Sequence, residues 1–144
     1  MHYQKINRQN YIIRLARGER IIESLKKFCQ KEKINGGFFY GLGAVDEVEI
    51  AHYDVKIKKY SSKKFDVALE MTNITGNIGF FQKEIIIHAH ASFADKNMQA
   101  LAGHLVEAKI SGTAEIFLIK TKKLEKFFDQ ETGLKLFSFK NILK

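Results

Sequence analysis

Apolar and polar residues alternate along most of the chain, a pattern typical of strands that bury one face. The alternation predicts strands in the following segments: residues 37–54, 63–81, 84–93, 102–110 and 113–121. A strand-like piece also precedes Gly18, and a turn near Gly133 is expected to lead into a last strand. The predicted architecture is therefore dominated by β-structure.

A helical period interrupts this alternation once. Five apolar residues recur at the spacing of one helix face: Ile21, Ile22, Leu25, Phe28 and Cys29. Acidic residues lie early in this segment and lysines lie late, which suits the dipole of a helix. The run from Asn35 to Gly37 is expected to end the helix. One helix packed over a mostly antiparallel sheet predicts an α+β fold.

Size and composition fit a single domain that spans residues 1–144. A chain of 144 residues, 45% of them hydrophobic, can bury one core. Cys29 is the only cysteine, so a disulfide framework is excluded and a reducing cytoplasm is the expected compartment. The N-terminal residues lack the apolar core of a signal peptide, and no segment approaches the roughly 18 apolar residues of a membrane span. We therefore expect neither export nor a membrane partner.

The net charge of +8 favours an anionic partner. Most of this charge comes from lysine, since Arg8, Arg14, Arg17 and Arg20 are the only arginines. Bidentate reading of base edges favours arginine, so any DNA binding is expected to be weak and non-specific. The competing interpretation is a solvated basic surface without a nucleic-acid partner.

Two closely spaced glycines in residues 40–45 raise the question of a nucleotide site. The third glycine of a dinucleotide-binding loop is missing, and strand-like alternation follows where such a fold would start a helix. We therefore interpret Gly41 and Gly43 as sites of a bulge or of close backbone approach.

Histidines supply the candidate chemistry. In an extended strand over residues 84–93, alternate side chains share a face, so His88 and His90 point the same way. His104 follows a short turn and can fold back beside them. Three neutral imidazoles can bind Zn²⁺ and leave a fourth position open to water, an arrangement associated with catalytic zinc sites. The alternative is a set of partly buried or surface histidines without a metal.

Two carboxylates follow the histidine strand. Glu115 is a residue that a hydrolytic mechanism could use, as a general base or as a hydrogen-bond acceptor behind a metal ligand. The alternative for Glu115 is a cross-strand partner of a lysine. Asp95 lies in an expected turn, which explains it without a catalytic role. Of the remaining histidines, His52 is expected to be an ordinary strand residue and His2 part of a mobile terminus.

Six segments, taken in their order and spacing, carry a resemblance to a known family. They are RLARGERIIESLKKFCQKEKI, GLGAVDEVEIAHYD, FDVALEMTNITGNI, IHAHASFADKN, AGHLVEAKISGTAEIFL and KFFDQETGLKLF. Through them the chain resembles the PPC domain, the plants and prokaryotes conserved domain. Plant AT-hook nuclear proteins carry this domain, and many bacteria and archaea have it as a stand-alone protein. The resemblance spans nearly the whole chain.

The resemblance implies a curved, mostly antiparallel sheet with one main helix packed against it, assembled as a homotrimer. It also implies a metal, expected to be zinc, held in the prokaryotic members by histidines that match His88, His90 and His104. Gly103 and His104 match the family's Gly-Gly-His-Leu motif, with Ala102 in place of its first glycine.

The DNA-binding label of the family comes largely from the AT-hook, an Arg-Gly-Arg-Pro core that reads the AT minor groove. This chain has no proline, and Glu19 stands where the segment ARGER would need the second arginine. DNA affinity is therefore expected to come from the lysines of the domain alone.

Three functions remain open at this point. The one we favour is a non-enzymatic trimeric module with a regulatory or DNA-associated role, in which zinc stabilises the loop between His90 and His104. The second is a zinc-dependent, hydrolase-like enzyme, in which Glu115 or Asp95 assists a metal-activated water in attacking an unknown small molecule. The third is a sensor of an unknown small ligand that uses the same pocket, and the sequence does not separate it from the others.

Overall fold

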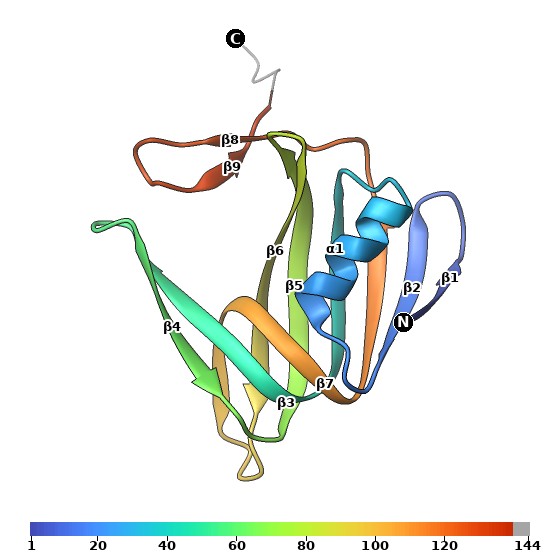
Figure 1. Ribbon diagram of the computed structural model, residues 1–144, viewed down its shortest axis with the longest axis vertical. Helices are drawn as coiled ribbons and strands as arrows, with labels where there is room; N and C mark the ends of the chain where they lie inside the picture. The colour runs from blue at the N-terminus through green and yellow to red at the C-terminus, as the bar shows by residue number, and fades with distance from the viewer. Residues whose placement is uncertain (140–144) are drawn as a thin grey trace.

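The computed structural model describes residues 1–139, which form a seven-stranded sheet, one helix and a two-stranded sheet. In chain order the elements are β1 (His2–Lys5), β2 (Asn10–Ala16), α1 (Ile21–Lys31), β3 (Gly37–Asp54), β4 (Lys59–Phe65), β5 (Leu69–Phe81), β6 (Glu84–Ala94), β7 (Ala100–Lys120), β8 (Lys126–Phe128) and β9 (Lys135–Phe137). The large sheet has the order β1-β2-β7-β6-β5-β3-β4, and its strands pair antiparallel (Figure 1). A mostly antiparallel sheet with one helix confirms the predicted α+β fold.

Strands β3 and β7 give the large sheet its curvature. They are 18 and 21 residues long and pair with each other through three register shifts. Each such irregularity adds bend and twist to the strand that carries it. Because β7 pairs with β6 near its start and with β2 near its end, it joins the two parts of the curved sheet.

The glycine pair in β3 lies at a point of close backbone approach. A Cβ on Gly41 would collide with the backbone oxygen of Glu115, and one on Gly43 with that of Thr113. The register between β3 and β5 also shifts between these two glycines. Both observations confirm the interpretation of the Gly-x-Gly sequence as a bulge with close packing.

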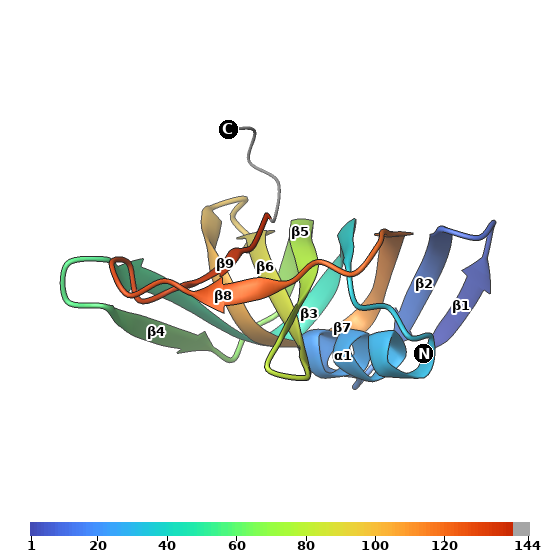
Figure 2. The ribbon, with the colours of Figure 1, turned by 90° about the horizontal axis from the view of Figure 1, so that it is seen from above.

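Helix α1 covers one face of the large sheet (Figure 2). Its buried residues are Ile21, Leu25, Phe28 and Cys29, all from the predicted apolar face. The Glu107 carboxylate of β7 accepts the backbone N–H of Ile22 at 2.9 Å and that of Glu23 at 3.1 Å, which satisfies two donors at the helix start. In the described part of the chain, no helix is long and apolar enough to cross a membrane.

The helix ends earlier than the sequence predicts. It stops at Lys31, before the expected terminator at Asn35 to Gly37. Lys33 has a φ of 52°, in the left-handed region, and the Ile34 N–H donates to the Cys29 carbonyl at 2.8 Å. A left-handed residue closes the last helical turn in this way, so the chain leaves the helix before it reaches the glycines.

The face of the large sheet opposite α1 carries a patch of apolar side chains. In β3, Phe38, Tyr40 and Leu42 are 45%, 48% and 57% exposed, whereas Phe39 between them is buried. We call this surface the open-face patch; it comprises Ile12, Phe38, Tyr40, Leu42, Phe117 and Ile119. Tyr40 lies opposite Phe117 across β3 and β7, and their ring centroids are 5.5 Å apart.

Three local expectations are wrong. Residues 63–81 do not form one strand, since β4 ends at Phe65 and β5 starts at Leu69. The segments 102–110 and 113–121 belong to one strand, β7, because β3 pairs with it on both sides of Gly112. His2 is part of β1 and pairs with Arg14, so it is an ordered strand residue.

Candidate metal centre

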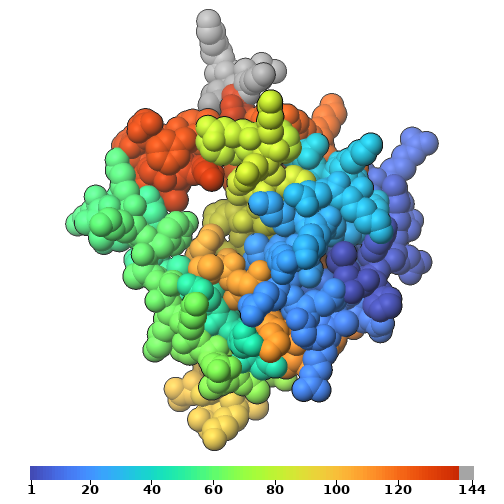
Figure 3. All heavy atoms as spheres, viewed as in Figure 1, coloured from blue at the N-terminus to red at the C-terminus, as the bar shows by residue number. Residues whose placement is uncertain are grey.

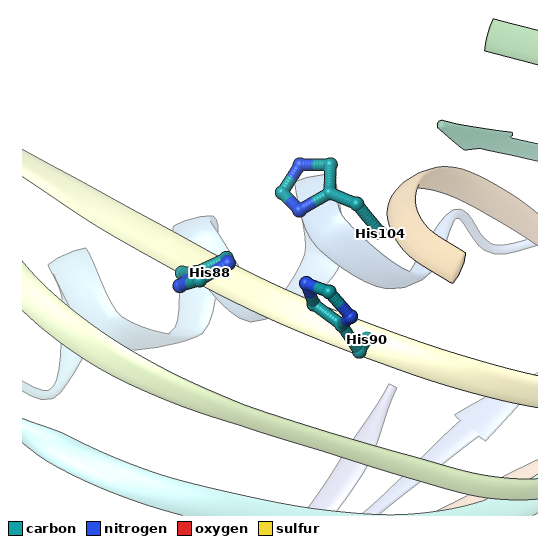
Figure 4. A group of neighbouring side chains, drawn as sticks. All are labelled: His88, His90 and His104. Atoms are coloured by element: carbon teal, nitrogen blue, oxygen red, sulfur yellow. The ribbon is translucent and has the colours of Figure 1, made fainter. Parts of the chain in front are cut away.

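The imidazoles of His88, His90 and His104 converge on one point (Figure 4). One ring nitrogen from each lies within 4.8 Å of those from the other two. The ring centroids are 5.3 Å apart for His88 and His90, 5.2 Å for His88 and His104, and 5.4 Å for His90 and His104. Three ligand atoms this close together can surround a single ion.

The β6–β7 hairpin brings these side chains together. Ile85, Ala89 and Ala91 of β6 are buried in the core, so the residues between them face the other side of the sheet. His90 pairs directly with His104 across β6 and β7, which places their side chains side by side on that face. The predicted common direction of the first two histidines is confirmed, and the third folds back beside them as expected.

Burial lowers the pKa of two of the three histidines. In His88, burial together with smaller contributions from the neighbouring His104, Lys126 and His90 brings the pKa to about 4. Burial also lowers the pKa of His104, with a smaller contribution from His90. The neutral imidazole is the form that binds a metal, so His88 and His104 would lose no proton on binding an ion at neutral pH.

One ring nitrogen of the triad could be satisfied by a metal ion. The Nδ1 atom of His104 is buried and forms no hydrogen bond with any residue in the described part of the chain. Buried polar atoms are normally satisfied, and an unsatisfied one points to a missing water or ion. Three imidazole nitrogens without a carboxylate in the group suit a borderline-soft divalent ion such as Zn²⁺.

The other sequence candidates lie outside this cluster. Glu115 is exposed on β7, eleven residues beyond His104, where it pairs with Leu42 and Arg14. A strand rises about 3.3 Å per residue, so β7 carries Glu115 away from the triad. The position of Glu115 therefore does not support a role as a base or hydrogen-bond acceptor beside the metal. The Asp95 carboxylate accepts the backbone N–H groups of Asn97 and Gln99, both at 2.8 Å, as the turn interpretation predicts.

A cavity of about 860 Å³ borders the triad, and all three histidines line it. Figure 3 shows the hollow between the β3–β4 hairpin, in green, and the β8–β9 hairpin, in red. Its polar lining includes Asn77, Tyr60 and Lys126, none of which the sequence indicated as functional. His52, an exposed strand residue as expected, also borders the cavity without joining the triad.

Comparison with known families identifies the relatives of this chain. The profile of the Plants and Prokaryotes Conserved (PCC) domain, the family called PPC above, matches residues 3–122. The chain belongs to this family. No protein among the curated sequences gives a significant match.

Several solved structures share this fold, and one of them is a plant- and prokaryote-conserved protein. A candidate DNA-binding protein from Bacteroides thetaiotaomicron is 28% identical, with a TM-score of 0.93 over 97% of this chain and 98% of that chain. A plant- and prokaryote-conserved protein from Pyrococcus horikoshii is 29% identical, with a TM-score of 0.84 over 93% and 94% of the two chains. A metal-containing protein from Archaeoglobus fulgidus is 23% identical, with a TM-score of 0.85 over 96% and 99%, and this likeness shows a shared fold.

In this PPC chain, Ala102 replaces the first glycine of the Gly-Gly-His-Leu motif without interrupting the pairing of β6 with β7. Ala102 is exposed and pairs with Ser92 in the β6–β7 ladder, so its methyl group meets no obstacle. At Gly103, by contrast, a Cβ would come within 3.1 Å of the Ala51 backbone oxygen. The packing is therefore tighter at the second glycine of the motif than at the first.

Acidification is expected to destabilise the metal-free protein. The pKa of His88 is about 4 in the folded chain against an ordinary value of 6.5, so the unfolded chain takes up a proton first as the pH falls. The free energy of unfolding should therefore decrease between about pH 6.5 and about pH 4. Urea unfolding of chelator-treated protein at several pH values measures this decrease. His88→Gln should flatten the pH dependence, and an unchanged slope in that variant would contradict the assignment.

Proposed function

We propose that this PPC protein is a zinc-binding regulatory module of the cytoplasm, without enzymatic activity, that assembles as a homotrimer and associates with DNA. His88, His90 and His104 would hold the zinc ion. The convergence of three imidazoles on one point, with a buried Nδ1 among them that has no partner within residues 1–139, is the observation that carries this proposal. When bound, zinc would act as a Lewis acid that accepts an oxygen ligand at its fourth position.

The cavity beside the triad favours a second candidate function, a sensor of a small ligand. Its volume of about 860 Å³ lies within the range of small-molecule sites. A zinc hydrolase would also need a base near the metal-bound water. Among the described residues that line the cavity there is no aspartate or glutamate, so the sensor fits the lining better than the hydrolase does.

The open-face patch supports the homotrimer. Exposed apolar patches of this kind often mark protein interfaces. Thr75 pairs with both Tyr40 and His90, and Asn77 pairs with both Phe38 and His88, so the patch and two histidines share one face of the sheet. Subunits that cover the patch would therefore lie next to the zinc site.

Leu42→Lys is expected to convert the trimer into monomers. Leu42 is 57% exposed, so the lysine can be solvated in the free subunit but would be buried without a partner in the assembly. Light scattering coupled to size-exclusion chromatography measures the mass. Val67→Lys is the matched control and should remain a trimer, because Val67 is similarly exposed, at 52%, and lies between β4 and β5. A trimeric Leu42→Lys protein would place the interface elsewhere.

Two observations support the association with DNA. The Bacteroides protein and a second relative from Ralstonia eutropha, 27% identical, are candidate DNA-binding proteins. The β3–β4 hairpin also concentrates positive charge, with five exposed lysines: Lys56, Lys58, Lys59, Lys63 and Lys64. Exposed lysines attract phosphates with little regard to base sequence.

The affinity for duplex DNA is expected to fall steeply with added salt. The logarithm of the binding constant should decrease linearly with the logarithm of the salt concentration. Fluorescence anisotropy with a labelled duplex measures the slope. Lys56→Gln with Lys59→Gln should reduce the slope by about two, since each lost phosphate contact removes about one. Lys27→Gln on α1, where Lys27 pairs with Glu23, is the control. Absence of binding at low salt would refute the DNA association.

A further inference from the structure

Lys126 brings a buried positive charge to the wall of the cavity. The residue is only 8% exposed, and its aliphatic chain lies over Gly79 of β5. The ammonium donates one hydrogen bond, to the Lys135 carbonyl at 3.3 Å, and lies 4.2 Å from the centroid of the Phe137 ring. Within residues 1–139 it forms no ion pair. A buried ammonium normally has an acidic partner, so this one is poised to accept an anion.

The lining of the cavity contains no negative charge that could fill this role. No aspartate or glutamate occurs among its described residues. Lys126 and His88 both line the cavity. A zinc ion on the triad would add two further positive charges to the same wall. An anionic ligand would therefore balance the positive charges of Lys126 and of a bound zinc ion.

The other residues that line the cavity indicate the chemical character of the rest of the anion. Ile86, Leu134 and Phe137 contribute apolar and aromatic surface to the lining. The Oδ1 atom of Asn77 is buried, has no hydrogen-bond partner among residues 1–139 and belongs to the same lining, so it offers an acceptor to a ligand hydroxyl or to a water. Apolar walls with a few polar groups are typical of sites for organic molecules rather than for hydrated inorganic ions.

We propose that the cavity binds a small organic carboxylate. The carboxylate would ligate a zinc ion held by His88, His90 and His104, its negative charge would pair with Lys126, and the apolar walls would enclose the rest of the molecule. This inference rests on the proposed zinc site and names the ligand class that the site selects. It makes Lys126 the residue that discriminates acids from neutral molecules.

Isothermal titration of the zinc-loaded full-length protein with benzoate tests this assignment. Lys126→Met keeps the aliphatic chain over Gly79 and removes the charge, so it should weaken benzoate binding about tenfold or more. Lys126→Arg keeps the charge and should stay within about threefold of the unchanged protein. Lys135→Met is the matched control, because Lys135 also lines the cavity but its ammonium lies over the Phe81 ring.

Benzamide, which has the same ring and no charge, should bind about tenfold more weakly than benzoate. Equal binding of benzoate and benzamide, or of benzoate to the unchanged and Lys126→Met proteins, would overturn the inference. Inorganic phosphate that binds as tightly as benzoate would overturn the organic class of the ligand. Zinc content is measured on the same samples. Protein without zinc refutes the proposed function, whereas zinc-loaded protein that ignores benzoate refutes only this inference.

Discussion

His88→Ala is expected to abolish stoichiometric zinc binding. The substitution removes one of three converging ligands and leaves two, too few to hold the ion against water and buffer. Because changes behind the ligands alone weaken metal sites by 10- to 100-fold, loss of a ligand should weaken binding by about 100-fold or more. A competition titration against a chromophoric zinc chelator measures the affinity.

His52→Ala is the matched control for this experiment. His52 lies at the same cavity but is exposed and outside the triad. Zinc affinity should stay unchanged in this variant, and circular dichroism should show that both variants keep the sheet. Equal zinc affinity in His88→Ala and in the unchanged protein would show that the ion, if present, binds at another site.

Phe28→Ala is expected to produce the largest loss of stability among single substitutions in the helix. Phe28 is fully buried, and its ring packs edge-on against Tyr3 at 4.9 Å and Tyr11 at 5.4 Å between centroids. Removing the ring loses its burial and leaves a cavity between α1 and the sheet, which should lower the free energy of unfolding by about 3–5 kcal/mol. Urea unfolding monitored by circular dichroism measures the change.

Phe128→Ala provides the comparison for this core substitution. Phe128 is 46% exposed on β8, so its removal should lower the free energy of unfolding by less than about 1 kcal/mol. Zinc binding by folded Phe28→Ala protein should be retained, because the histidines lie on the opposite face of the sheet. A loss of less than about 1 kcal/mol in Phe28→Ala would mean that α1 is not anchored as described.

Local patterns in the sequence predict much of this molecule because local interactions determine much of it. The alternation in residues 84–93 assigned His88 and His90 to one face, and the turn at Asp95 is stabilised by its own side chain. Since a hairpin joins neighbouring segments, the approach of His104 could be expected from the sequence. The family resemblance pointed to the same three residues.

Long-range packing explains what the sequence did not predict. Glu115 was a candidate because it follows His104 in the chain, but β7 continues as one strand whose pairing with β2 and β3 carries it onward. Lys126 was missed because its place beside the histidines depends on packing between distant segments. Nothing in its own segment indicates that the β8–β9 hairpin packs over Gly79 and brings an ammonium to the histidine cavity. Such placements depend on contacts between segments that are distant in sequence.

Anomalous diffraction at the zinc absorption edge, from crystals of the zinc-loaded protein, would locate the ion. We expect one anomalous peak per chain, at about 2.0–2.1 Å from a ring nitrogen of each of His88, His90 and His104. A zinc-loaded crystal with no peak between these three side chains would contradict the proposed zinc site.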